Sequence, residues 1–536
     1  MPGTFRRIPL SVKGAYAIDC VRHEDNRGFF QEIFHCDKYP NSATTTTTTT
    51  TTNDKETTKE DANANNYICP SNFQQVSQSH NVPFVFRGIH RSLYAKLVTC
   101  ISGSCMDYVV DLRPESPTFL QWCCIPISAK NQRQVLVPER CGHAFVSLDE
   151  GALILYLQEG TFNPPHEWDF YWKDELLQIK WDGLVPDLDK NVIVSAKDQK
   201  APSVRERLES VMDVSTLTQN HKQRVLVIGA SGQLGTALCK LYKGSVGTRS
   251  STASASYAAP HCYMEYNLET ASDEDAQLLL EMVRPTILII CGAFTWVDGC
   301  ERNPDKAMNV NCHGPARLVK AAQQFASKTS TSSRNMQIVF YSTDYVFDGT
   351  KDFSLKYTEE DAVSPMNAYG RSKLQGEQAI LKESPSALIL RTSVVYGPDP
   401  NAKNFVCQML RHQKQQQGMD TVTKKTLPVD QTGCPTYVVD LAAMTKLLLE
   451  KEASGVFNLV GSEAYGRFDF AEKFVPGLSV GITTAEMNLP TPRPLNGSLD
   501  NTKVKEFLGD QFQIRGIQEA LKDWSPKEEE FMNMRQ

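Results

Sequence analysis

The chain has 536 residues, of which 41% are hydrophobic and 22% charged, with 31 glycines and 28 prolines. These values are ordinary for a globular protein and exclude a wholly disordered chain, a collagen and a coiled-coil rod. At roughly 100–200 residues per domain, the length predicts two or three domains. The formal net charge of −6 provides no basic field, so neither nucleic acid nor an anionic membrane surface is an expected partner.

The sequence also predicts the compartment. No apolar run approaches the roughly 20 residues that cross a bilayer, and the start MPGTFRRIPLSVKG lacks the apolar core of a secretory signal. The fifteen cysteines are odd in number and show no paired spacing, which is typical of reduced thiols. We therefore predict a cytoplasmic protein without a membrane segment.

The first half of the chain has a strand-like pattern interrupted by one polar insertion. Residues 41–66 contain nine consecutive threonines and then polar and charged residues, which predicts a disordered loop. Apolar runs follow at 96–113, 133–148 and 151–158, separated by Gly, Pro and Asn turns. Short strands at this spacing indicate a β-sandwich or β-barrel.

After a polar stretch the pattern changes. The run RVLVIGA at 224–230 is typical of a buried parallel strand, and later apolar strands alternate with helical segments. That alternation predicts a doubly wound α/β Rossmann sheet. We predict an all-β domain over 1–200, a linker over 201–222 and an α/β domain over 223–536.

Several ionisable residues stand inside the apolar runs of the first domain. Such residues are costly to bury unless they are paired, so a group of them indicates a lined cavity. They are Arg87, His90, Lys96, His143, Tyr156 and Asp198. For His143 alone, a hydrogen-bonded core histidine is the alternative. A metal held by His90 and His143 is a further alternative, but RGIH lacks the second nearby histidine of a cupin metal motif, and we predict no metal.

Residues 5–202, without the threonine insertion, contain the motifs DNRGFFQE, RGIH, KLV, VVDLRPESPTF, NQRQVLVPE, HAF and SAKDQKAP. By these motifs the region resembles the dTDP-4-dehydrorhamnose 3,5-epimerases. The resemblance implies a cupin-like β-barrel that uses no metal. It departs from the family pattern at Ser77, at Phe162 and at the run 140–142 beside His143.

The resemblance also implies roles for single residues. His90 would be the base, Asp198 its orienting carboxylate and Tyr156 the acid on the opposite face of the sugar. Lys96 would stabilise the enolate that proton removal creates. The nucleotide-sugar would be bound by Arg27, Arg87 and His143.

The second half opens with a candidate dinucleotide site. In GASGQLG, Gly229 permits a tight turn, while Gly232 and Gly235 let the backbone and helix approach a pyrophosphate; Gln233 and Leu234 belong to the same turn. An acidic residue after the second strand would favour NADH, but the text there is SVGTRSS. Because Arg249 suits a 2′-phosphate, we predict NADPH, with NADH as the alternative.

A candidate catalytic group lies further along. Tyr369 and Lys373 are four residues apart in NAYGRSK and share one helix face. A cation beside a phenol favours the phenolate, so this pair can serve in acid–base chemistry. Thr343 stands where an apolar strand ends and can orient a reacting carbonyl.

Residues 224–509 resemble the dTDP-4-dehydrorhamnose reductases among the extended short-chain dehydrogenase/reductases. The text includes STDYVFDG, PMNAYGRSKLQGEQAI, VDQTGCPT and RPLNGSLD, with Val394 replacing the usual Trp. The resemblance implies a small substrate-binding lobe and a homodimer. Tyr369 would donate the proton, Lys373 would bind the nicotinamide ribose, and Thr343 would bind the carbonyl. The residues near the nucleotide-sugar would be Gln431, Pro435 and Thr436.

The two resemblances name consecutive steps, so we predict a bifunctional enzyme of L-rhamnose biosynthesis. It would epimerise dTDP- or UDP-4-keto-6-deoxyglucose at C3 and C5 and then reduce C4. The alternatives are the same chemistry on another nucleotide-deoxyhexose, or a non-catalytic regulatory subunit resembling that of methionine adenosyltransferase.

Overall fold

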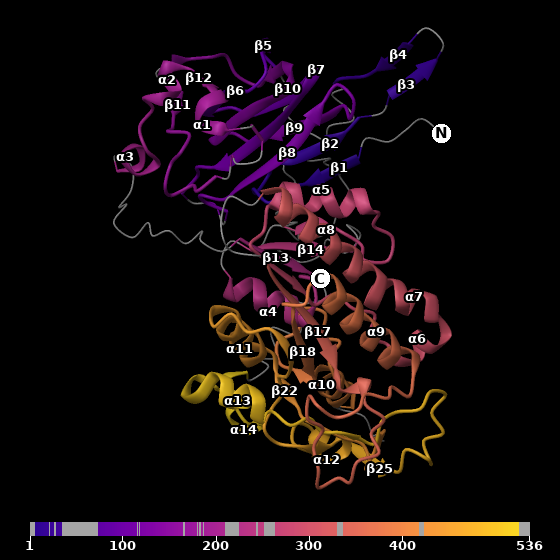
Figure 1. The fold of residues 1–536 in the computed structure, drawn as a ribbon. Helices are drawn as coiled ribbons and strands as arrows, with labels where there is room; N and C mark the ends of the chain where they lie inside the picture. The colour runs from indigo at the N-terminus through magenta and orange to yellow at the C-terminus, as the bar shows by residue number, and fades with distance from the viewer. Residues whose placement is uncertain are drawn as a thin grey trace, which may run out of the picture.

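The computed structural model describes most of the chain outside a few segments. The described residues are 6–20, 22–25, 28–34, 73–209 without 115, 117, 165, 166, 180, 182, 183 and 186, then 224–242, 245–250, 263–329, 336–416 and 423–524. Figure 1 shows a strand-rich N-terminal domain beside an α/β C-terminal domain. The predicted threonine-rich loop and the predicted phosphate ligand Arg27 lie outside the described residues.

The N-terminal domain is built on a ten-stranded sheet, in which all but one of the pairings are antiparallel. Along its main path the strands follow the order β1-β2-β9-β7-β10-β6-β11, while β8 pairs with β7, β5 with β10 and β12 with β6. Their bounds are Arg6–Pro9 (β1), Tyr16–Asp19 (β2), Gln75–Asn81 (β5), Val85–Arg91 (β6), Lys96–Asp111 (β7), Trp122–Ser128 (β8), Arg133–Val137 (β9), Cys141–Gln158 (β10), Trp168–Asp169 (β11) and Ile193–Val194 (β12). A separate hairpin joins β3 (Arg22–Asp25) to β4 (Gly28–Gln31).

The long strands β7 and β10 hold this sheet together. Both turn at a glycine with positive φ, Gly103 and Gly151, where a Cβ on Gly103 would lie 2.1 Å from the Gly151 carbonyl oxygen. On one side of the turn β10 pairs with β6, and on the other side it pairs with β5. The predicted β-rich domain is confirmed, whereas the closed cupin-like barrel stays a prediction.

Short helices follow the last strands of this domain. They are α1 (Leu188–Asn191), α2 (Ala196–Gln199) and α3 (Val204–Leu208). Ser195 caps α2 by accepting a hydrogen bond from the Asp198 backbone nitrogen at 3.1 Å. Val204 and Leu208 on α3 are buried with the aromatic core of this domain, so the first turn of the predicted linker packs onto the domain that precedes it.

The C-terminal domain contains a seven-stranded sheet in which every pairing is parallel. Its order is β15-β14-β13-β16-β17-β18-β23, which confirms the predicted doubly wound α/β architecture. The strands are β13 (Val225–Ile228), β14 (Val246–Arg249), β15 (Tyr263–Glu265), β16 (Ile287–Ile290), β17 (Gln337–Thr343), β18 (Leu388–Thr392) and β23 (Gly455–Asn458). The helices around the sheet are α4 (Gln233–Leu241), α5 (Asp273–Val283), α6 (Val297–Arg302), α7 (Pro304–Met308), α8 (Gly314–Thr329), α9 (Ala368–Glu383) and α11 (Val438–Glu450).

A smaller lobe lies at one end of this sheet, drawn in orange and yellow at the bottom of Figure 1. It combines short strand pairs with helices. Its elements include α10 (Phe405–Gln416), β20 (Lys425–Pro428), β21 (Thr432–Gly433), β24 (Tyr465–Gly466), α12 (Arg467–Glu472), β25 (Ser479–Ile482) and β26 (Asn496–Gly497). The helices α13 (Thr502–Leu508) and α14 (Ile517–Asp523) end the described chain.

The two domains touch through β8 and α5. The Cys124 thiol donates to the Glu281 carbonyl oxygen at 2.7 Å, and apolar residues of both domains form one continuous buried cluster. None of the helices in the described part of the chain is both long and apolar enough to span a membrane.

Candidate active sites in the two domains

The N-terminal domain contains a cavity of about 290 Å³. Five of the ionisable residues that the sequence singled out line it, on strands β6, β7 and β10: Arg87, His90, Lys96, His143 and Tyr156. Ser77 and Phe162, two of the departures from the epimerase pattern, also line it. The cavity therefore gathers chemistry-bearing residues that are far apart in the sequence.

His90 is held by a buried carboxylate. Its Nε2 lies 2.8 Å from Asp198 Oδ1, and Asp198 is only 3% exposed. Burial by itself would raise the pKa of Asp198, but the hydrogen bond and the charge of His90 hold that pKa below its usual value. An ionised carboxylate fixes the imidazole orientation and stabilises an imidazolium, as a base requires.

Lys96 and Tyr156 supply a cation and a phenol to the same cavity. Burial lowers the pKa of Lys96, and the charge of Glu167 opposes that effect. The Tyr156 hydroxyl lies 3.0 Å from Ser79 Oγ, and burial raises the pKa of this phenol, with Ser79 opposing. Tyr156 is therefore held protonated, as an acid must be.

His143 combines both of its predicted readings, because it lines the cavity and is also hydrogen-bonded in the core. Its Nε2 lies 2.7 Å from Oδ2 of the fully buried Asp107. Burial raises the pKa of Asp107, and the His143 contact works against that rise. Asp107 was not predicted as a site residue, although it is a carboxylate inside the apolar run MDYVV, like the ionisable residues that were predicted.

Two further carboxylates in the cavity wall were also missed. Glu167 accepts a hydrogen bond from Ser92 Oγ at 2.5 Å, and Asp169 lies 3.6 Å from His90 Nε2. Both stand in the segment HEWD, which carries no apolar pattern. Within the described ranges, no three His, Cys, Asp or Glu side chains are gathered as a metal-binding group.

The glycine turn of the C-terminal domain joins β13 to α4, as predicted. Gly229 has a φ of +83°, and a Cβ on Gly235 would lie 2.3 Å from the Gly229 carbonyl oxygen. Gly232 is the N-cap of α4 and is partly exposed. Because it is a glycine, it places no side chain in the turn. The first N–H groups of a helix have no acceptor within the helix, so a glycine turn at the start of α4 suits a dinucleotide pyrophosphate.

The remaining predicted cofactor residues surround this turn. Gln233 donates from Nε2 to the Gly397 carbonyl oxygen at 3.2 Å, and Leu234 packs against the core. Arg249 is the last residue of β14 and is partly exposed. Parallel strands place these groups at the carboxyl edge of the sheet, where ligands of such folds bind.

Thr343 and Tyr369 come together at the same edge. Thr343 ends β17, and its hydroxyl donates to Asp344 Oδ1 at 2.8 Å. Tyr369 lies in the first turn of α9, where the Asn367 side chain caps the helix by accepting from the Gly370 nitrogen at 2.9 Å. Burial raises the pKa of Tyr369, and a hydrogen bond with Thr343 opposes that rise.

Lys373 shares α9 with Tyr369, but its described contact differs from the one expected. Its Nζ donates to the Tyr341 carbonyl oxygen at 2.6 Å and lies 3.9 Å from the centroid of the Phe340 ring. Burial lowers the pKa of Lys373 to about 7. These contacts fix the end of the Lys373 side chain against β17, and its action as a cation on the Tyr369 phenol stays a prediction.

Asp344 was not predicted as a site residue. It is 7% exposed and accepts hydrogen bonds from the Thr343 and Ser393 hydroxyls, at 2.8 and 2.9 Å. Burial raises its pKa to about 6, against the effect of these bonds. The signal available in STDYVF was a carboxylate directly after Thr343, the predicted carbonyl-binding residue.

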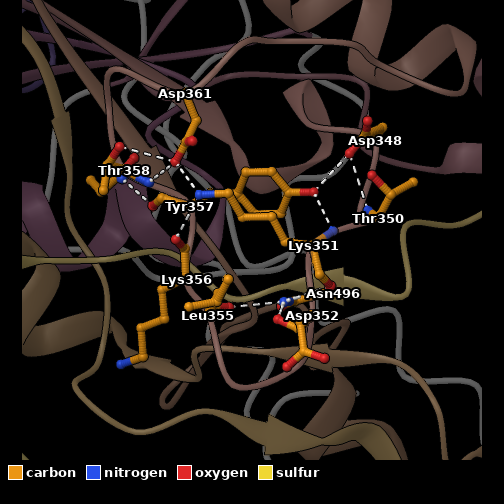
Figure 2. A network of polar contacts seen from close by, with 11 residues as sticks. Asp348, Thr350, Lys351, Asp352, Leu355, Lys356, Tyr357, Thr358, Asp361 and Asn496 are labelled. Atoms are coloured by element: carbon orange, nitrogen blue, oxygen red, sulfur yellow. Dashed lines mark hydrogen bonds and ion pairs between the residues drawn. The ribbon is translucent and has the colours of Figure 1, made fainter.

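The loop after this strand is fixed by a polar network, which Figure 2 shows. The Tyr357 hydroxyl donates to Asp348 Oδ1 at 2.7 Å, and Lys351 Nζ lies 2.5 Å from Asp361 Oδ2. Asn496 on β26 donates from Nδ2 to the carbonyl oxygens of Asp352 and Leu355, at 3.0 and 2.9 Å. The network ties the loop after Thr343 and Asp344 to the segment RPLNGSLD.

The three predicted nucleotide-sugar residues of the lobe have different surroundings. Gln431 is partly exposed and donates from Nε2 to Thr484 Oγ1 at 3.0 Å. Pro435 is buried. Thr436 is fully buried, and its hydroxyl donates to the Cys434 carbonyl oxygen at 3.0 Å, so this hydroxyl serves the local fold.

Two family profiles and several known proteins match this chain. The profile described as RmlD substrate binding domain matches residues 223–527, and the profile described as dTDP-4-dehydrorhamnose 3,5-epimerase matches residues 48–206. The dTDP-4-dehydrorhamnose reductase of Aggregatibacter actinomycetemcomitans is 32% identical over 317 residues, which cover 56% of this chain and 97% of the relative.

The chain is also similar to a methionine adenosyltransferase subunit and to a solved epimerase. Methionine adenosyltransferase 2 subunit beta of Danio rerio is 28% identical over 56% of this chain and 90% of its own length. The solved dTDP-4-dehydrorhamnose 3,5-epimerase of Elizabethkingia anophelis NUHP1 is 28% identical, covering 38% of this chain and 99% of that chain, with a TM-score of 0.31. The chain therefore belongs to the RmlD substrate-binding-domain family of dTDP-4-dehydrorhamnose reductases, and the region ahead of that domain matches the dTDP-4-dehydrorhamnose 3,5-epimerase profile.

Proposed function

We propose that the chain converts dTDP-4-keto-6-deoxyglucose to dTDP-L-rhamnose in two steps. The N-terminal domain epimerises C3 and C5, and the C-terminal domain reduces C4 with NADPH. The observation that carries this proposal is the cavity that His90, held by Asp198, lines together with Lys96 and Tyr156, in a chain whose residues 223–527 match the RmlD substrate binding domain.

In the first step His90 removes the proton next to the C4 ketone. Asp198, 2.8 Å away, stabilises the imidazolium that results. Lys96 stabilises the negative charge of the enolate oxygen, and Tyr156 returns a proton to the other face of the ring, which inverts the centre. Arg87 and Arg27 are proposed to bind the nucleotide phosphates, with His143 near the sugar.

In the second step the chain binds and protonates the ketone. When bound, NADPH supplies the hydride that C4 accepts. Thr343 turns its hydroxyl from Asp344 Oδ1 to the carbonyl oxygen of the substrate, and Tyr369 gives that oxygen the proton that completes the alcohol. Lys373 is proposed to bind the nicotinamide ribose, the turn from Gly229 to Gly235 to hold the pyrophosphate, and Arg249 to hold the 2′-phosphate.

The small lobe supplies the remaining proposed contacts with the substrate. Gln431 is proposed to meet the nucleotide-sugar, because it is partly exposed. Pro435 and Thr436 are buried, and we propose that they support the substrate-binding surface of the lobe from its interior. The matched families name dTDP sugars, which favours dTDP over the UDP alternative.

Two properties of the whole chain complete the proposal. A reducing compartment such as the cytoplasm is favoured by the free thiol state of the twelve cysteines in the described ranges. A homodimer is the assembly that the reductase and epimerase resemblances imply, and sedimentation of the full chain tests it. We also propose the domain division into 1–200, 201–222 and 223–536, with the first turn of the linker packed on the first domain.

The test is proton NMR of the product formed from dTDP-4-keto-6-deoxyglucose and NADPH in D2O. We expect a rhamnose-configured product with deuterium at C3 and C5. Tyr369→Phe should stop NADPH oxidation and leave deuterium exchange intact, whereas Tyr242→Phe, which removes a buried hydroxyl without a described partner, should change neither.

Each other outcome has a definite meaning. A reduced sugar that retains protons at C3 and C5 would contradict epimerisation by the N-terminal domain. Absence of conversion of both dTDP and UDP substrates would favour a regulatory protein, which the similarity to methionine adenosyltransferase 2 subunit beta makes the second candidate.

A further inference from the structure

Asp169 is a carboxylate beside His90 to which the mechanism above gives no role. It is the second residue of β11 and stands directly opposite His90 on β6 in the antiparallel register. Its Oδ1 lies 3.6 Å from His90 Nε2, while Asp198 Oδ1 lies 2.8 Å from the same nitrogen. His90 therefore faces two carboxylates that come from different elements.

The two carboxylates act on His90 differently. Asp198 lies at hydrogen-bond distance, whereas 3.6 Å is too long for a hydrogen bond, so Asp169 acts through its charge. The side chain of Asp169 is 18% exposed, and water screens it only in part. Its negative charge favours the protonated imidazole.

Asp169 is also shared with a lysine. Lys197 Nζ lies 2.9 Å from Asp169 Oδ1, and Lys197 lines the same cavity. Lys197 immediately precedes Asp198, so α2 delivers both the carboxylate that orients His90 and the ammonium that offsets Asp169. The electrostatic potential at His90 thus depends on both the negative charge of Asp169 and the positive charge of Lys197 beside it.

We propose that Asp169 and Lys197 form a positioning pair that sets the pH range in which His90 works as the base. Asp169 stabilises the imidazolium formed on proton removal, and Lys197, 2.9 Å from the same carboxylate oxygen, offsets part of that charge. This inference rests on the epimerisation proposed above. Neither residue transfers a proton itself.

Other ionisable groups also face His90 from the elements around the cavity. They are Arg87 on β6, Lys96 on β7, His143 with Asp107 behind it, Tyr156 on β10, and Glu167 before β11. They remain unchanged when Asp169 or Lys197 is substituted, so the comparison of variants isolates the pair.

The test follows deuterium uptake at C3 and C5 of dTDP-4-keto-6-deoxyglucose by the full chain between pH 5 and pH 9. In Asp169→Asn we expect the acid limb of the kcat/KM profile to move about half to one pH unit lower, because the imidazole is protonated less readily. In Lys197→Met the limb should move higher by a similar amount. Lys200→Met removes an equal charge from the exposed end of α2 and should leave the profile in place.

Opposite shifts of the acid limb in the two variants support the proposed pair, since a purely structural role would leave the acid limb of both profiles in place. Coincident profiles, or shifts in the same direction, would overturn it. If Asp169→Asn does not fold, as judged by circular dichroism and NADPH oxidation, the upward shift in Lys197→Met alone decides. Full exchange in His90→Asn would instead contradict the proposed function, so the two failures are distinguishable.

Discussion

Arg224 of the C-terminal domain lies over Trp122 of the N-terminal domain, with 3.8 Å between its guanidinium carbon and the centroid of the ring. Its Nη2 also donates to the Trp122 carbonyl oxygen at 3.1 Å, and its Nε donates to the Val283 carbonyl oxygen at 2.7 Å. Burial lowers the pKa of Arg224 to about 10. One residue thus fastens the start of β13 to β8 and to the end of α5.

Replacing Arg224 by Ala should weaken the contact between the domains. The substitution removes a cation–π contact and two hydrogen bonds from a charged donor, so we expect the free energy of unfolding to fall by about 2–4 kcal/mol. Differential scanning calorimetry should then resolve separate unfolding transitions for the two domains. In the parent chain we expect the two domains to unfold more cooperatively. Lys240→Ala, on the exposed end of α4, is the control. An unchanged calorimetric profile in Arg224→Ala would show that the contact contributes no stability.

The sequence was sufficient for the parts of the molecule that follow a hydrophobic pattern. Apolar runs ending in glycine predicted the parallel sheet, and ionisable residues inside apolar strands predicted the cavity around His90 and Tyr156. Asp169 could not be found this way, because β11 has two residues and no pattern of its own. Only its register opposite His90 brings it to the cavity.

Helix spacing also has a limit that Lys373 illustrates. A separation of four residues predicts that Tyr369 and Lys373 share a face of α9, which the structure supports. Spacing does not determine where a long side chain ends. The buried ammonium of Lys373 needs an acceptor, and the Tyr341 carbonyl oxygen on β17 is the one it takes.

Tyr156→Phe should separate proton removal from inversion. The base His90 remains, so exchange should still place deuterium at C3 and C5. Without an acid on the other face of the ring, the deuterium should be added on the face from which His90 removed the proton, and the configuration is kept. We expect inversion to fall at least about 100-fold while exchange persists. NMR of the recovered sugar in D2O measures both.

Tyr171→Phe, a phenol of the same domain that does not line the cavity, is the control for that experiment. Loss of exchange together with inversion in Tyr156→Phe would assign Tyr156 to enolate formation instead. Ser79→Ala removes the hydroxyl 3.0 Å from the phenol and should affect inversion more weakly.

Glu377→Gln should destabilise the C-terminal domain strongly. Glu377 and Arg391 form a buried two-point ion pair, with oxygen–nitrogen distances of 3.0 and 2.8 Å. Because the substitution leaves a buried guanidinium without its counter-charge, we expect a loss of about 3–5 kcal/mol in urea unfolding. Glu383→Gln, at the end of the same helix, should cost far less. Equal losses in the two variants would contradict the prediction.

Asp344 should make stability depend on pH in an unusual direction. Its pKa is raised to about 6 in the folded chain, against about 3.9 for an exposed aspartate. Between these values the folded carboxyl keeps a proton that the unfolded one has lost, so the free energy of unfolding falls as pH rises through this window. The full effect is about 3 kcal/mol, present as a cost above pH 6 and absent below pH 4.

Asp344→Asn removes that titration, since an amide stays neutral. We therefore expect its Tm, relative to the parent chain, to be higher at pH 7.5 than at pH 4.5. Asp361→Asn is the control: burial alone would raise the pKa of Asp361, but the hydrogen bond from Lys351 lowers it, so its ionised form stabilises the fold. A lowered pKa affects stability only below the pKa of the unfolded aspartate, so this variant should lose about the same stability at pH 7.5 and at pH 4.5. If Asp344→Asn also showed the same difference from the parent chain at both pH values, the raised pKa of Asp344 would be contradicted.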